Sequence, residues 1–149
     1  MPEKKTLERA RRDRAQGKSP STQAGEFVHE EIEHVREGKH GARSTKQAIA
    51  IGLAKARRAG VKLPPPPSSA KETTKRSAAS ASRAGMSHRK PSARRSRAML
   101  KRLKRERHDT VSTKALSKQA KSAARRRSTA ARKRSAQKAV RTRRRHASA

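Results

Sequence analysis

The chain of 149 residues has one aromatic residue, Phe27, and contains no Trp and no Tyr. Aromatic side chains bury about 150–250 Å² each and supply much of the apolar area of a globular core. Hydrophobic residues make up only 30% of the chain and charged residues 36%, against about 45–50% and 25% in ordinary soluble domains. A large core is therefore excluded, and we expect disorder wherever local structure does not intervene.

The positive charge is concentrated in the second half of the chain. The formal net charge is +32. Residues 1–63 contain 15 Lys and Arg against 8 Asp and Glu, whereas residues 64–149 contain 28 against 3. Such an asymmetry points to a polyanionic partner, of which nucleic acid is the commonest. We predict DNA as the first choice of partner and RNA as the second.

Several classes of protein are excluded by what the chain lacks. It has no cysteine, which rules out disulfides, thiolate metal sites and a cysteine nucleophile. No apolar run approaches the ~18 residues of a transmembrane helix. The segment MPEKKTLERARRDR has no apolar stretch of the kind found in a secretory signal. We therefore expect a cytoplasmic, nucleoid-associated protein with no membrane partner.

The segment 20–37 has the pattern of an amphipathic helix. The Ser19 hydroxyl can cap its first turn, and Pro20 occupies the first helical position, where its missing N–H costs nothing. Gly38 is placed to end the helix in a left-handed conformation. One sector carries the apolar residues, and four glutamates face away from it. The apolar set is Ala24, Phe27, Val28, Ile32 and Val35, and the glutamates are Glu26, Glu30, Glu33 and Glu37.

A second helix is predicted over residues 45–59, after a short loop. Ser44 and Gln47 match a Ser-x-x-Gln capping box, and Gly60 follows as the stop. Two amphipathic helices joined by a short loop make an αα-hairpin, which would anchor the chain or form a homodimer. Its expected core comprises Phe27, Val28, Ile32, Val35, Ile49, Leu53, Val61 and Leu63.

The rest of the chain is expected to be weakly structured. Residues 1–18 predict an exposed, marginal basic helix, and residues 64–92 read as a Pro/Ser/Ala linker that begins with four prolines. Residues 93–149 have high helix propensity, but repulsion between Lys and Arg should keep this arm disordered or nascent-helical in free solution. The predicted fold is thus mostly α, with a small hairpin domain at 19–63 and a largely disordered basic arm.

The candidate phosphate contacts lie in this arm. Each Lys or Arg can neutralise a phosphate and release condensed counterions. Stacking on single-stranded bases is excluded because it needs aromatic platforms. The first-choice residues are Arg125, Arg126, Arg127, Arg132, Lys133, Arg134, Arg143, Arg144 and Arg145, and the second choices are Lys101, Arg102, Lys104 and Arg105.

Catalytic and metal-binding motifs are not recognisable. In the sequence HEEIEH, His29 and His34 are five residues apart. The zincin motif requires histidines four residues apart on one helical face. Histidines five residues apart point in directions that differ by about 140°, at ~100° per residue. The loop sequence GKHGARS lacks the Gly-Lys-Ser/Thr ending of a phosphate-binding loop. We therefore predict no enzyme, no cofactor and no metal site.

The segment SPSTQAGEFVHEEIEHVREGKHGARSTKQAIAIGLAKARRAGVKLPPP, residues 19–66, resembles a bacterial family of small basic proteins. The stretch ARSTKQAIAIGLAKARRAG is its specific part, and the domain of that family has no known function. The Lys/Ala/Arg tail also resembles linker-histone-like bacterial proteins in composition. The resemblance implies DNA binding and provides no catalytic residues.

The predicted function is non-specific DNA binding by the cationic arm, of a nucleoid-associated or histone-like kind. Charge alone leaves a second interpretation open, a protein that binds structured RNA or the ribosome. A third interpretation is a protein–protein adaptor, in which the acidic face of the first hairpin helix and Ile51 recruit a partner.

Overall fold

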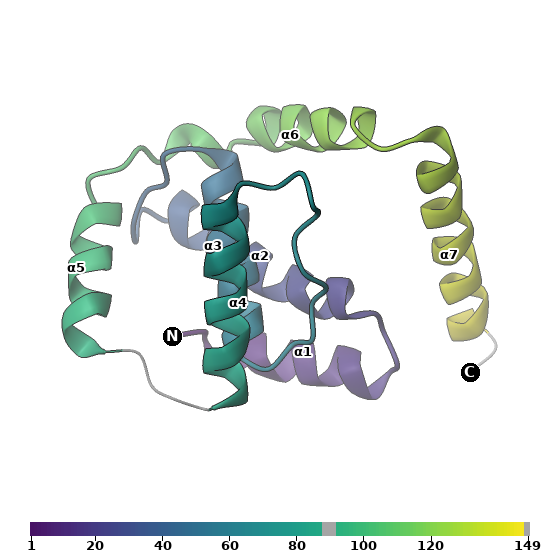
Figure 1. Ribbon diagram of the computed structural model, residues 1–149, viewed down its shortest axis with the longest axis horizontal. Helices are drawn as coiled ribbons and strands as arrows, with labels where there is room; N and C mark the ends of the chain where they lie inside the picture. The colour runs from purple at the N-terminus through teal and green to yellow at the C-terminus, as the bar shows by residue number, and fades with distance from the viewer. Residues whose placement is uncertain (88–91, 148–149) are drawn as a thin grey trace. The chain divides into compact units, whose positions relative to one another are not determined.

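The computed structural model describes residues 1–87 and 92–147, and these residues form seven α-helices and one 3₁₀ turn (Figure 1). The contacts divide the chain into two compact units, residues 1–112 and residues 113–149. The predicted fold, a small hairpin followed by a disordered arm, is therefore wrong. The helices are α1 (Lys4–Ala15), α2 (Pro20–Arg36), α3 (Thr45–Arg58), α4 (Glu72–Met86), α5 (Ala93–Leu103), η1 (Asp109–Val111), α6 (Thr113–Arg125) and α7 (Thr129–Ala147).

The two helices of the predicted hairpin are present as α2 and α3. The N–H of Gln47 donates to the Ser44 hydroxyl at 3.2 Å, and the Gln47 side chain accepts from the N–H of Arg43 at 2.7 Å. Gly38 and Gly60 end the two helices with φ of +74° and +89°. These local signals placed each helix to within one residue, because caps and stops depend on neighbours in the chain.

The hairpin is one part of a larger helical unit. Helix α1 packs against α2, where Leu7 and the buried Ala10 contact the cluster around Phe27. Leu53 and Val61 complete this cluster as partly buried neighbours. The helix predicted at the start of the chain is present and most of its residues are exposed, but it buries Thr6, Ala10 and Asp13 and is docked on α2.

Helix α4 lies in the segment expected to be a linker, and it packs along α3. Ala78 and Ala81 are buried on this face. At Gly85 a Cβ atom would lie 2.2 Å from the carbonyl oxygen of Arg57, so the two backbones approach too closely for any side chain. Small residues permit such an approach and gain dispersion contacts without large side chains. A search for large apolar residues at helical spacing therefore missed this helix.

The segment after α5 covers the loop between α2 and α3. The N–H of Ala42 donates to the carbonyl of Arg107 at 2.8 Å, and the Thr110 hydroxyl donates to the carbonyl of Ala42 at 3.0 Å. Val111 is fully buried in a second small core with Val35. The loop is thus held by a segment more than sixty positions away in the sequence.

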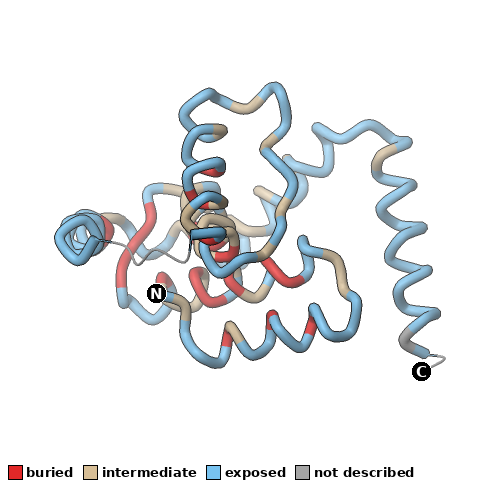
Figure 2. Tube along the Cα trace, turned by 60° about the horizontal axis from the view of Figure 1, so that its bottom comes forward, coloured by how far each residue is buried: buried red, intermediate tan, exposed pale blue. Residues whose placement is uncertain are grey.

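The unit formed by residues 113–149 consists of α6 and α7. Figure 2 shows that almost all of the described length of α7 is exposed, with none of it buried, whereas buried residues recur along α1, α2 and α3. Helix α6 buries none of its residues. Ala, Lys, Arg and Gln are strong helix formers, and this local preference accounts for the helices. The expectation of a disordered or nascent-helical arm is wrong because helix propensity outweighs the repulsion between Lys and Arg in this segment.

Candidate functional site

All thirteen predicted phosphate contacts are exposed. The four second choices belong to the first unit, in α5 and the turn that follows it. The nine first choices belong to the second unit, where Arg126 and Arg127 lie between α6 and α7. These nine side chains are exposed, and residues 113–149 contain 14 Lys and Arg and no Asp or Glu.

The basic residues of α7 occupy two sectors of the helix surface. At ~100° per residue, Arg132, Lys133, Arg143 and Arg144 fall in one sector, and Arg134, Lys138, Arg141 and Arg145 fall in the other. The remaining sector carries small residues, among them Ala131, Ser135 and Ala139. Nineteen residues make a rod of about 28 Å. Helix α7 therefore presents cations on two flanks along its length.

Helix α6 carries a basic stripe that the sequence analysis missed. Lys114, Lys118, Lys121 and Arg125 follow one another at intervals of four, three and four residues, which places them on one face of the helix. The predicted phosphate contacts are mostly runs of adjacent Arg and Lys. Adjacent side chains in a helix point in directions that differ by ~100°. The spacing of the lysines was the signal that could have found this face, which we call the α6 stripe.

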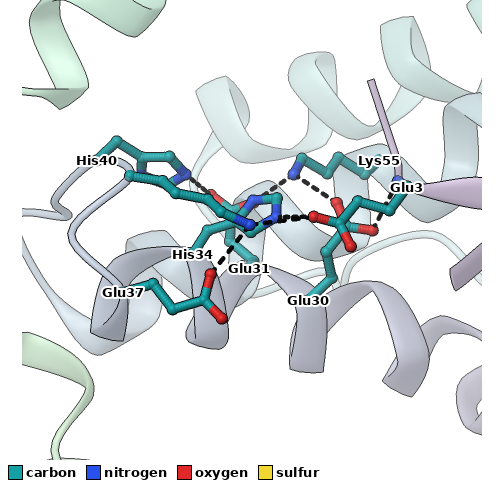
Figure 3. A network of polar contacts seen from close by, with 8 residues as sticks. Glu3, Glu30, Glu31, His34, Glu37, His40 and Lys55 are labelled. Atoms are coloured by element: carbon teal, nitrogen blue, oxygen red, sulfur yellow. Dashed lines mark hydrogen bonds and ion pairs between the residues drawn. The ribbon is translucent and has the colours of Figure 1, made fainter. Parts of the chain in front are cut away.

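The first unit contains a buried network of charged residues at the contact of α2 and α3 (Figure 3). The Glu30 side chain is 3% exposed and that of Glu31 is 1% exposed. The Lys55 ammonium lies 3.0 Å from Oε1 of Glu30 and 2.7 Å from Oε2 of Glu31. The prediction that Glu30 faces away from the core was wrong, because α1 and α3 cover α2 from two sides.

The network alters the protonation of its members. Burial disfavours the charged form of Glu30, but hydrogen bonds from Thr6, Lys55 and the N–H of Glu3 outweigh it and hold the pKa of Glu30 below its usual value. Burial also opposes the charge on Lys55, yet the Glu31 and Glu30 carboxylates raise its pKa. Both groups are therefore charged near neutral pH, and each stabilises the other.

Two histidines extend the network. Nε2 of His40 lies 3.2 Å from Oε1 of Glu31, and Nε2 of His34 lies 2.9 Å from Oε1 of Glu3. His40 is buried in the α2–α3 loop, whereas His29 is exposed on α2 and does not belong to the cluster. Spacing along the helix relates His34 to His29, whereas only the return of the loop brings His40 close to Glu31.

Residues 3–66 match a protein family described as a family of unknown function, DUF6496. The matched segment runs from α1 to the prolines after α3, and it includes the buried network. No curated protein and no solved structure matches the chain. Within the described residues, none of the helices is both long and apolar enough to cross a membrane. The resemblance to a domain of unknown function is thus confirmed, while a bacterial origin and a histone-like tail stay predictions.

Proposed function

We propose that this protein binds DNA without sequence specificity through the cationic helices of residues 113–149. The observation that carries the proposal is the charge of this unit: 14 Lys and Arg, no Asp or Glu, and nine predicted phosphate contacts that are exposed on α6, α7 and the turn between them. Each cation that meets a phosphate releases counterions, which supplies essentially all of the free energy of non-specific binding.

The helical form of the arm supports a more definite mechanism than a disordered polycation would. The major groove of B-DNA is about 12 Å wide and admits one α-helix, with a phosphate backbone on each side. The two basic sectors of α7 can contact the phosphate backbones of both DNA strands at once. The α6 stripe can contact the phosphate backbone of one strand. Helices that exist before binding also lose less conformational entropy on association. Contacts of this kind position the protein and read no bases.

The α6 stripe provides the sharpest test. In a variant with Lys114→Gln, Lys118→Gln and Lys121→Gln, the slope of log K against log salt for duplex DNA should become shallower by about 2 to 3, because each lost contact removes ~0.9. Fluorescence anisotropy of a labelled duplex at several salt concentrations measures the slope. For the unaltered protein, about eight contacts predict a slope near −7.

A control variant removes the same charge from the first unit. Lys4→Gln, Lys5→Gln and Arg11→Gln change three exposed cations of α1, and they should leave the slope nearly unchanged. If the slope became equally shallow in both variants, DNA binding would depend on the net charge of the chain and not on the position of the cations. A slope shallower than about −2 for the unaltered protein would refute the mechanism. Tighter binding to duplex RNA of the same length would move the proposal to RNA.

A further inference from the structure

Three side chains of the first unit converge in a way that suits a metal ion (Figure 3). Glu31 and His34 come from α2, and His40 comes from the loop after it. Each offers one ligand atom, and these atoms lie within 4.8 Å of one another. The two imidazole rings are nearly perpendicular, with centroids 6.0 Å apart. We propose that Glu31, His34 and His40 bind a divalent transition metal ion, with Zn²⁺ the best match to this donor set.

The hydrogen bonding of His40 shows which of its nitrogens faces the site. Nδ1 lies 3.1 Å from the carbonyl oxygen of Gly41, and a carbonyl can only accept, so Nδ1 carries the proton. In neutral His40, Nε2 is then the unprotonated nitrogen, and it lies 3.2 Å from Oε1 of Glu31. Two acceptors at this distance need a cation between them, either a proton or a metal ion. A backbone carbonyl on the remote nitrogen is the usual partner of a metal-binding histidine.

The Glu31 carboxylate gives a second, independent indication. Its side chain is 1% exposed, yet neither oxygen has a hydrogen bond of acceptable geometry to a described group. The Lys55 ammonium forms an ion pair with Oε2 at 2.7 Å. Buried carboxylates are normally paired and hydrogen-bonded because desolvation is costly. A metal ion on Oε1 would satisfy this group, with Lys55 balancing Oε2.

The local charge also matches a dication. The network joins four carboxylates to two ammonium groups by contacts of 2.7–3.2 Å, which leaves a formal charge of −2 when both imidazoles are neutral. The carboxylates are Glu3, Glu30, Glu31 and Glu37, and the ammonium groups are Lys39 and Lys55. This is a local excess of negative charge in a chain of net charge +32, and it is where a divalent cation would be stabilised.

The arrangement fits a structural site. Imidazole and carboxylate ligands suit Zn²⁺, and three protein ligands leave the fourth position for water. Such an ion would link helix α2 and the α2–α3 loop. Metal binding of this kind adds its free energy to folding. The expectation of no metal site was based on the spacing of His29 and His34 and on the absence of cysteine, whereas the proposed site uses His34 and His40.

The test uses the full chain, stripped with a chelator and exchanged into chelator-free buffer. Zn²⁺ is titrated in competition with a chromophoric chelator, and thermal unfolding is followed with and without one equivalent of Zn²⁺. We expect one saturable site per chain and a higher unfolding temperature with the metal. X-ray absorption of the zinc-loaded protein should show two imidazole ligands.

Two variants test the ligands, and one matched variant serves as the control. His34→Gln and His40→Gln should each weaken Zn²⁺ binding by at least ~10-fold, since even partners of metal ligands contribute 10- to 100-fold. His29→Gln removes an exposed histidine of the same helix and should bind as the unaltered protein does. If His40→Gln fails to fold, His34→Gln decides, because the side chain of His34 is partly exposed, at 14%.

The outcomes separate the proposal from its alternatives. Absence of a saturable single site would overturn it and leave a proton as the cation between His40 and Glu31. A single site that survives His34→Gln, or that His29→Gln weakens equally, would also overturn it, because the zinc would then be bound elsewhere. DNA binding by residues 113–149 is not involved in any of these measurements, so this inference and the proposed function can fail separately.

Discussion

The two units of the molecule form helices for different physical reasons. In residues 1–112, α2 and α3 bury Phe27, Val35 and several alanines, and charged side chains such as Lys55 and Glu31 are paired. In residues 113–149, α6 buries nothing and no acidic residue is present to pair with the cations. Tertiary contacts therefore stabilise the first unit, whereas local helix propensity accounts for the second.

This difference matters for function because it separates folding from binding. Residues 1–112 contain 29 Lys and Arg against 11 Asp and Glu, so acidic residues offset part of the positive charge of this unit. A unit without acidic residues keeps its charge available, at the cost of having no core. We expect the first unit to unfold cooperatively, and the second to lose its helices gradually because few of its residues depend on one another.

The largest effect is expected from Phe27→Ala. Removing a buried Phe costs ~3–5 kcal/mol, a large fraction of the ~5–15 kcal/mol by which domains are stable. The cooperative transition of the first unit should move to much lower temperature, as followed by circular dichroism. DNA affinity measured by anisotropy should change little. Loss of DNA binding in this variant would contradict the separation of the two units.

A smaller effect is expected from Glu30→Gln, which breaks the charge pairing of the first unit. At neutral pH it should cost about 1.5–3 kcal/mol, the contribution of a hydrogen bond to a charged group. Because folding lowers the pKa of Glu30, its stabilisation is complete above the unfolded pKa near 4.5. This stabilisation is lost as the pH falls through the lower folded pKa.

Urea unfolding at a series of acidic pH values measures this contribution. The unaltered protein should lose stability below about pH 4.5 more steeply than Glu30→Gln, since the glutamine cannot be protonated there. Glu8→Gln changes an exposed glutamate of α1 and is the control. If Glu8→Gln reduced the pH dependence of the unfolding free energy as much as Glu30→Gln, that pH dependence would not come from the buried network.

The smallest changes in stability are expected from two glycine substitutions, and the two changes should have opposite signs. A Cβ at Gly52 would lie 2.7 Å from Cα of Val28, whereas a Cβ at Gly25 would meet nothing within 4 Å. Gly25→Ala should stabilise the first unit by up to ~1 kcal/mol through helix propensity. Gly52→Ala should destabilise it, because overpacking costs ~1–3 kcal/mol and outweighs the same gain.

Thermal unfolding of the two variants measures the difference directly. Both positions are helical, so propensity alone predicts the same change at each. A gain of stability in Gly52→Ala would show that the α2–α3 contact yields easily, and that the first unit resembles the second more closely than its packing suggests.

Local features of the sequence were interpreted correctly where a few neighbouring residues decide the outcome. Ser44 and Gln47 cap α3 as predicted, and Gly38 and Gly60 adopt positive φ. Phe27 and Val35 are buried as predicted. The α6 stripe was equally local and could have been predicted from the spacing of Lys114, Lys118 and Lys121. Caps, stops and helix faces depend on chain geometry within a turn or two, which a sequence displays directly.

The sequence by itself determined the asymmetry of charge, the small size of the core and the ends of α2 and α3. Only the tertiary structure decided that α4 docks on α3 and that Glu30 is buried. It also decided that His40 faces Glu31, although the two are nine residues apart. The reason is that these outcomes depend on contacts between elements: α4 meets α3 through small residues such as Gly85 and Ala81, and α3 approaches α2 closely at Gly52. Small residues permit close approach but leave no periodic pattern of large apolar side chains that would predict it.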